Sequence, residues 1–130
     1  TGSIDGLYRL SGNWGEKFVV VDYKTNAIHA ANGSPEEIVA SYGFDSMKSE
    51  MEHHDYPLQA LVYSVALHRF LELRLPNYEP EKHLGGSGYL FLRGMTGVDT
   101  PVVDGKRNGV FMWRPSVETV QRVSELFNGM

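Results

Sequence analysis

The 130-residue sequence predicts a single α/β domain, spanning residues 1–130, with a mixed central β-sheet flanked by helices. Two observations predict this class. Runs of β-branched and aromatic residues indicate strands near the N-terminus and again after residue 84, while capped, helix-periodic segments occupy the middle and the end of the chain. The length suits one buried core, and 42% hydrophobic with 22% charged residues is typical of globular proteins rather than disordered chains.

The first predicted element is a β-hairpin. Residues 3–10 form one strand, residues 11–16 the turn and residues 17–24 the second strand, which contains the β-branched run Val19-Val20-Val21.

Two short helices are predicted next. Ser34 is a suitable N-cap, because Pro35 follows at the first helical position and Glu36 and Glu37 place acids in the first turn. A second helix begins near Asp45 and carries two methionines, Met47 and Met51, on one face.

The longest predicted helix runs over residues 55–75, from an N-cap at Asp55 to the stop at Pro76. At 100° per residue, Ser64, His68 and Glu72 form a polar stripe. Gln59 falls on the opposite, inward face, among the aromatic and apolar residues Tyr56, Tyr63, Ala66 and Phe70. An inward amide needs hydrogen-bond partners, which either the core or a site must supply.

The C-terminal part returns to strands. Residues 89–92 are a continuous apolar run, typical of a central strand that is covered on both faces, and follow the glycine-rich residues 85–88. Residues 94–109 are rich in turn residues and predict a loop, and residues 110–113 predict a strand. Ser116 then caps a terminal helix that presents Val117, Val120, Val123 and Phe127.

Composition excludes several functions. The absence of cysteine excludes disulfides, thiolate metal sites and cysteine nucleophiles. The sequence shows neither a signal-peptide pattern nor an apolar run of membrane-spanning length, so we expect a soluble cytoplasmic protein without a membrane partner. Its net charge of −4 gives no global basic field, so binding of nucleic acid would need a local basic cleft or help from elsewhere.

The most informative local feature is Asp22-Tyr23-Lys24, at the end of the second strand. Alternation places Asp22 and Lys24 on one face, and Asp5 reaches the same end if the hairpin pairs as predicted. Two converging carboxylates repel one another unless a cation lies between them, and such oxygen ligands suit Mg²⁺ or Mn²⁺. The triplet alone also fits a solvated strand end or a surface ion pair, and we interpret a second one, at residues 104–106, as a chance occurrence.

Other motifs are weaker. His53 and His54, adjacent before a helix cap, point in different directions and are interpreted as exposed rather than metal-binding. The glycine-rich residues 85–88 lack the lysine and serine of a P-loop, and no nucleophile-elbow motif positions a serine for triad chemistry.

Taken together, several segments resemble the C-terminal nuclease domain of RecB-type subunits of bacterial helicase–nucleases. The resemblance spans almost the whole chain in the same order, and it is carried by GSID at residues 2–5, VVDYKTN at 20–26, YPLQALVY at 56–63 with ALHR at 66–69, and GGSGYLFLRG at 85–94.

This resemblance implies the restriction-endonuclease-like PD-(D/E)xK fold. It implies that Asp5 and Asp22 are metal ligands together with the Tyr23 backbone carbonyl, that Lys24 is the catalytic lysine, and that Gln59 and Tyr63 are the helix pair beside the active site. Gln59 is therefore singled out twice, by its inward position and by the motif.

The sequence departs from the family pattern in two places. Gly6 stands where the family has an apolar residue after the first aspartate, which loosens the strand. The family also uses a metal-ligating histidine from a helix upstream of that aspartate, and none of the histidines of this chain (His29, His53, His54, His68 and His83) matches that position. We therefore expect an N-terminally truncated nuclease domain lacking one metal ligand, and the fragment alone to be inactive if that ligand is essential.

The function implied is that of a Mg²⁺-dependent exodeoxyribonuclease acting on linear DNA in double-strand-break repair and recombination. RecC-like and RecD-like subunits are the implied partners, besides DNA, and ATP would serve only the helicase part of the parent protein. Two alternatives stay open: a non-catalytic nuclease-like module that binds DNA ends or partner subunits, and a restriction-type endonuclease.

Overall fold

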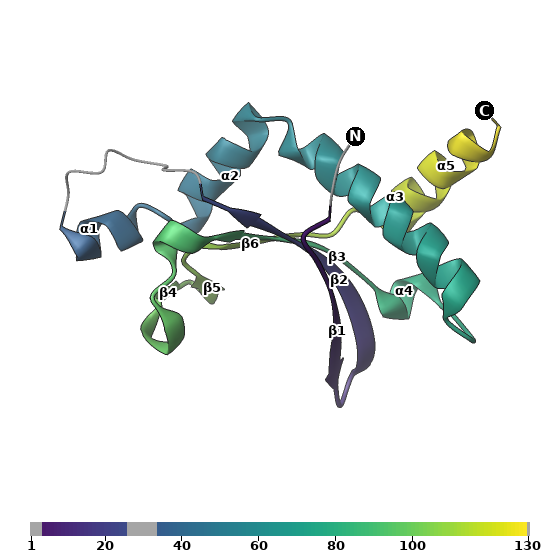
Figure 1. Ribbon diagram of the computed structural model, residues 1–130, viewed down its shortest axis with the longest axis horizontal. Coiled ribbons are helices and arrows are strands. Elements are labelled where there is room, and N and C mark those ends of the chain that lie inside the picture. The colour runs from purple at the N-terminus through teal and green to yellow at the C-terminus, as the bar shows by residue number, and fades with distance from the viewer. Residues whose placement is uncertain (1–3, 26–33, 130) are drawn as a thin grey trace.

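A mixed four-stranded sheet forms the centre of the protein, whose computed structural model describes residues 4–25 and 34–129 (Figure 1). The strand order is β1-β2-β3-β6, where the strands are β1 (Gly6–Gly12), β2 (Gly15–Lys24), β3 (Leu84–Phe91) and β6 (Val110–Trp113). β2 and β3 are parallel, whereas β1 pairs antiparallel with β2 and β6 antiparallel with β3. The predicted α/β class with a mixed central sheet is confirmed.

Helices follow β2 and β6, and all of them were predicted except the short α4. They are α1 (Pro35–Ala40), α2 (Phe44–His53), α3 (Tyr56–Arg74), α4 (Pro80–His83) and α5 (Val117–Asn128). Figure 1 shows α2, α3 and α5 on the same side of the sheet. None of the helices in the described part of the chain is long and apolar enough to cross a membrane.

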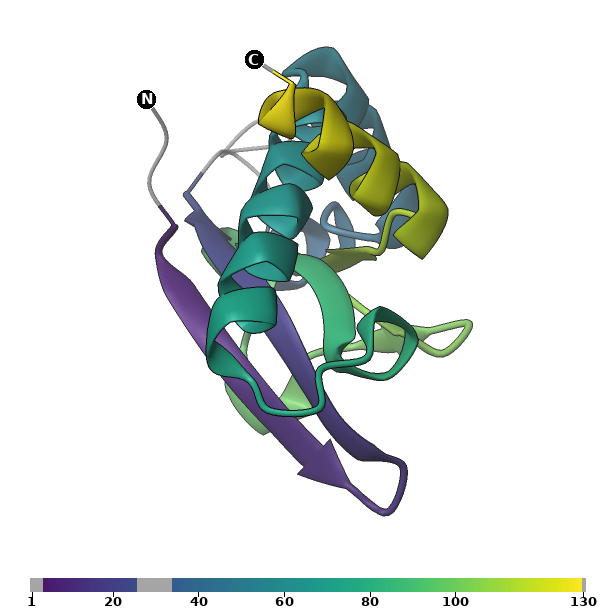
Figure 2. The same ribbon diagram turned by 90° about the vertical axis from the view of Figure 1, so that its right-hand side faces the viewer.

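The β1–β2 hairpin has a tighter turn than the six residues predicted. Gly12 pairs with Gly15, which leaves Asn13 and Trp14 as the turn. Gly15 makes this turn accessible because it adopts a positive φ of 100°, a conformation open to glycine. The two long strands project beyond the rest of the sheet in both views (Figures 1 and 2).

The predicted loop after β3 contains short regular pieces. Two 3₁₀ turns, η1 (Leu92–Gly94) and η2 (Gly97–Asp99), precede a small hairpin of β4 (Val102–Val103) and β5 (Lys106–Arg107). Asp104 and Gly105 both have positive φ at its two-residue turn, which is the geometry that matches the twist of paired strands.

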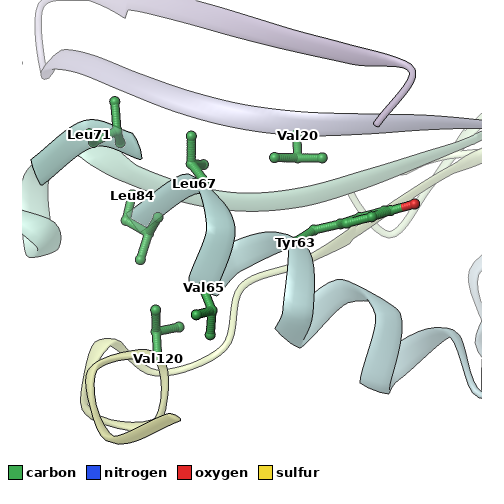
Figure 3. Close-up of a cluster of buried hydrophobic side chains, with 7 residues drawn as sticks. All are labelled: Val20, Tyr63, Val65, Leu67, Leu71, Leu84 and Val120. Atoms are coloured by element: carbon green, nitrogen blue, oxygen red, sulfur yellow. The ribbon is translucent and has the colours of Figure 1, made fainter. Parts of the chain in front are cut away.

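Two clusters of buried side chains pack on one face of the sheet. The first joins α3 and α5 to β2 and β3, and its members are Val20, Tyr63, Val65, Leu67, Leu71, Leu84 and Val120 (Figure 3). The second joins α2 and the start of α3 to β3 and β6, and its members are Tyr42, Met47, Met51, Ala60, Tyr89, Phe91 and Phe111. The predicted burial of Met47 and Met51 is thus confirmed.

The predicted central strand is confirmed for residues 89–91, since β3 lies between β2 and β6 and these residues are buried or half-buried, whereas Leu92 is exposed after the strand ends. The outer strands are more open on the face away from α3. Val19 and Val21 point away from α3 and are buried, yet Tyr8, Tyr23 and Met112 on this face remain substantially exposed. The absence of a side chain at Gly88 leaves room for Met112, whose sulfur would lie only 2.9 Å from a β-carbon at that position.

Helix ends follow the predicted capping signals with one exception. Ser34 forms a full capping box with Glu37, and the Ser116 hydroxyl accepts from the Thr119 amide. Asp55 precedes α3 as predicted, but it adopts a left-handed conformation (φ 56°) and its side chain makes no capping bond.

Two predicted faces are wrong. Ser64 and His68 belong to the polar stripe of α3, yet both are buried, and the ring of Tyr78 lies against His68. Conversely Ala66, Phe70 and Phe127 are exposed, since the described elements leave their sides of α3 and α5 uncovered.

Candidate active site

Two carboxylates and an ammonium group meet at the end of β2. Asp22 and Lys24 project from the face of β2 that packs on α3, and Lys24 Nζ lies 3.2 Å from Asp22 Oδ2. Asp5 directly precedes β1, whose register sets Gly6 opposite Val21. As a result, Asp5 Oδ2 accepts a hydrogen bond of 3.0 Å from the Tyr23 amide, and the predicted convergence of Asp5 with Asp22 is observed.

The two carboxyl groups have opposite protonation preferences. Burial raises the pKa of Asp22, contact with the Asp5 carboxylate raises it further, and the Lys24 ammonium only partly opposes both. The pKa of Asp5 is lowered, chiefly by the hydrogen bond from the Tyr23 amide and then by its contact with Asp22. The pair is therefore electrostatically strained in its fully ionised form, and a bound cation would relieve this strain.

Aromatic rings surround the lysine. Lys24 Nζ lies 3.9 Å from the centre of the Tyr56 ring and 5.6 Å from that of Tyr89. Tyr89 belongs to β3, where the parallel register pairs it with Asp22, and Tyr56 begins α3. With its side chain only 12% exposed, Lys24 is held in a cage formed by elements distant in the sequence.

Helix α3 contributes the glutamine and tyrosine implied by the resemblance. The Tyr63 hydroxyl donates to Asp22 Oδ2 over 3.5 Å, and burial with the nearby carboxylates raises the pKa of Tyr63. Gln59 Oε1 accepts from the Tyr89 hydroxyl, also over 3.5 Å. The partner that an inward Gln59 requires is therefore the tyrosine that packs against Lys24.

Tyr23 serves the site through its backbone. Its amide binds Asp5, while its side chain lies on the opposite face of the sheet, where its hydroxyl is 2.5 Å from that of Tyr8. This arrangement leaves the carbonyl of Tyr23 in the strand segment between Asp22 and Lys24, which is where the resemblance implies a third metal ligand.

The described histidines lie elsewhere or at the margin of the site. His68 is buried against Tyr78, and His83 bonds the backbone of Glu79. His53 and His54 are exposed at the end of α2, as predicted, and His29 lies outside the described residues. Within residues 4–25 and 34–129 no cluster of three or more His, Asp or Glu residues surrounds a potential metal position.

A hollow of the described structure lies away from this site. It has a volume of about 680 Å³ and lies between α1, α2 and the β4–β5 hairpin. Lys106 of the second aspartate-x-lysine triplet lines it, with Nζ 3.6 Å from the centre of the Phe44 ring. Lys106 is exposed, whereas the Lys24 ammonium is largely buried against Asp22, which Asp5 also contacts, so we assign the chemistry to the strand end rather than to the hollow.

Sequence reasoning missed the role of Tyr56 and Tyr89. Tyr89 lies in an apolar run, and the only available signal was that a buried tyrosine needs a polar partner. It also missed that His54 stacks on Tyr56, with ring centres 5.5 Å apart, and so lies near Lys24.

The sequence has relatives of established name. Over 128 residues, 98% of its length, the chain is 50% identical to RecBCD enzyme subunit RecB of Mycolicibacterium smegmatis. It is 47% identical over 127 residues to the RecB subunit of Mycobacterium tuberculosis, and 34% identical over 129 residues to that of Escherichia coli. The chain spans about a tenth of the length of these curated relatives, the matched parts being 10–11%. No protein-family model matches it.

Proposed function

The chain is homologous to a segment of the RecB subunit of the RecBCD enzyme, and from this premise and the site geometry we propose that it is the C-terminal part of a nuclease domain with a PD-(D/E)xK core. The observation that carries the proposal is the convergence of Asp5, Asp22 and Lys24 at the end of one hairpin. In the full-length protein this domain would hydrolyse linear DNA as an exodeoxyribonuclease during DNA repair and recombination.

The donor set fits Mg²⁺. Asp5, Asp22 and the Tyr23 carbonyl offer hard oxygen ligands, and a divalent cation would favour the ionised form of Asp22, whose pKa is raised by burial and by contact with Asp5. When bound, Mg²⁺ would polarise the scissile phosphate and lower the pKa of a coordinated water. We further propose that a histidine ligand comes from a part of the full-length protein outside this chain, as the family resemblance implies.

Lys24 acts on the phosphate. Its ammonium group is fixed by Asp22 and by the face of the Tyr56 ring, so it donates hydrogen bonds from a position that needs no rearrangement during the reaction. Such a group orients the attacking water and offsets the negative charge that develops on the phosphate oxygens. Tyr63 and Gln59 hold the cage in place through Asp22 and Tyr89.

The proposed setting is a multi-subunit enzyme. DNA is the substrate, RecC-like and RecD-like subunits are the partners, and ATP serves a motor outside this chain. Because the chain itself carries a net charge of −4, delivery of DNA to the site would depend on these other parts.

The test compares substrates with and without ends. The full-length protein that contains this chain, purified with its partner subunits, is incubated with Mg²⁺ and either end-labelled linear DNA or a closed circle. Degradation of the linear DNA alone, lost in Asp22→Ala and Lys24→Ala, is expected. Cleavage of the circle would favour the endonuclease alternative, and parental activity in both variants would favour the non-catalytic module.

A further inference from the structure

A stack of three rings connects the lysine to an exposed histidine. The ring stack consists of His54, Tyr56 and Tyr89. His54 and Tyr56 lie 5.5 Å apart between ring centres and 27° from parallel, and Tyr56 and Tyr89 lie 5.9 Å apart and 22° from parallel. The Lys24 ammonium rests on the middle ring, 3.9 Å from its centre. Lys24 Nζ lies 3.9 Å and the centre of the His54 ring 5.5 Å from the centre of the Tyr56 ring. The distance between Lys24 Nζ and the centre of the His54 ring therefore cannot exceed the sum of these two distances.

His54 is also held at its other side. Its Nε2 atom lies 3.0 Å from Glu50 Oε1, one helical turn earlier in α2. The carboxylate and the stack on Tyr56 together fix the plane and direction of the imidazole, although the side chain is 47% exposed. An exposed surface histidine without a role needs neither restraint, whereas a group that contacts a substrate benefits from both.

The pairing leaves one nitrogen for another partner. Nε2 faces Glu50, so Nδ1 lies outside this ion pair, and an imidazole carrying both protons presents it as a charged donor. A phosphate oxygen is the acceptor that such a donor suits best, through a charge-assisted hydrogen bond. His53 differs: its ring meets that of His54 edge-on, with 86° between the two planes, so it does not continue the stack of near-parallel rings.

We propose that His54 is a substrate-positioning residue that binds the phosphate chain of the DNA strand beside the phosphate contacted by Lys24. This inference rests on the proposed nuclease function and extends it to the α2–α3 junction. Tyr56 acts as the common support, so that one ring sets both the ammonium and the imidazole against the same strand.

The test uses variants that separate the ring from its nitrogen atoms. His54→Phe retains an aromatic ring on Tyr56 but loses both nitrogens, and His54→Arg stacks on the ring and restores a cation that pairs with Glu50. His53→Phe is the matched control at the neighbouring exposed histidine. All are measured in the full-length protein with its partner subunits, by single-turnover cleavage of an end-labelled single-stranded oligonucleotide at saturating protein, together with melting temperature.

We expect His54→Phe to lower the maximal cleavage rate about tenfold or more, the loss of one charge-assisted hydrogen bond. His54→Arg should recover most of that rate, and His53→Phe should cleave as the parent does. Glu50→Gln leaves His54 in place but removes the charge that orients it, so this variant should also have a lower maximal cleavage rate. One outcome is that His54→Phe lowers the melting temperature as well as the cleavage rate. In that case, an Arg variant that recovers the cleavage rate but not the melting temperature still supports a contact between residue 54 and the DNA phosphate.

Two results would overturn the inference: parental cleavage by His54→Phe, or equal losses in the Phe and Arg variants. The outcome is separable from that of the proposed function, which Lys24→Ala tests. An inactive Lys24→Ala beside a fully active His54→Phe rejects only the role of His54, whereas a fully active Lys24→Ala rejects the nuclease site itself.

Discussion

Two lysines in the same short pattern provide a direct test of the assignment. Lys24 and Lys106 each follow an aspartate by two positions, and each ammonium lies on an aromatic face, at 3.9 Å from Tyr56 and 3.6 Å from Phe44. We expect Lys24→Met to abolish most DNA cleavage and Lys106→Met to leave it unchanged. Methionine retains an unbranched stem of similar volume, so each variant removes little more than the charge.

The magnitude follows from the surroundings of each ammonium. Removing one fixed donor from a developing charge lowers a rate about 10²- to 10³-fold, about 2.7–4 kcal/mol. Lys24→Met also leaves the Asp22 carboxylate beside Asp5 without its partner, and the pKa of Asp22, already raised by burial, then rises further because Lys24 no longer lowers it. Protonation of Asp22 thus limits the loss of stability to roughly 1–3 kcal/mol. Lys106→Met loses only an exposed cation–π contact of about 0.5–1 kcal/mol.

The assay is single-turnover cleavage of end-labelled linear DNA with Mg²⁺ by the full-length protein, with the melting temperature of each variant recorded beside it. Parental cleavage by the Lys24 variant would refute the assignment of the catalytic lysine. Equal losses in both variants would show that charge in general, rather than the geometry at β2, supports the activity.

Three further outcomes are expected. Ser64→Ala should stabilise the chain by about 1–2 kcal/mol in thermal unfolding, because Ser64 is fully buried and its hydroxyl lacks a hydrogen-bond partner among the described residues. The control is Ser49→Ala at an exposed helical site, which should show only the gain in helix propensity. Burial raises the pKa of Tyr78 to about 12, so between pH 10 and 12 the unfolded chain binds fewer protons than the folded one and the free energy of unfolding falls. Tyr78→Phe should lessen this alkaline loss by roughly 1–2 kcal/mol in denaturant titrations. An equal loss of stability in the parent and in Tyr78→Phe would contradict the burial argument. Mg²⁺ at a hundredfold excess over its dissociation constant should stabilise the parent by about 2.7 kcal/mol and chelation should reverse this, whereas Asp22→Ala should show no metal-dependent shift in calorimetry.

Local signals made much of the fold predictable. The hairpin, the capping box at Ser34 and the helix breaker at Pro76 each depend on residues close in the sequence, so their effects do not require knowledge of the tertiary structure. The convergence of Asp5 with Asp22 was predictable for the same reason, because one antiparallel register relates them.

The remainder depends on contacts between distant segments. Tyr89 reaches Lys24 only because β3 pairs in parallel with β2, and no local pattern specifies that register. Ser64 and His68 have the spacing of a solvated stripe, yet both are buried, His68 against Tyr78. His54 was interpreted as an exposed residue, which it is, but its stack on Tyr56 follows from the left-handed turn at Asp55 that joins α2 to α3.

The parallel pairing of β2 with β3 also sets an order of assembly. The hairpin that holds Asp5 and Asp22 closes a short loop, whereas the β2–β3 contact closes a long one that includes α1, α2 and α3, and loop closure is slower for more distant segments. We therefore expect the two carboxylates to meet early in folding, before Lys24 contacts the rings of Tyr56 and Tyr89. The site is complete only when β3 pairs with β2 and α3 packs on the sheet, so we expect activity to return during refolding no earlier than this non-local contact forms.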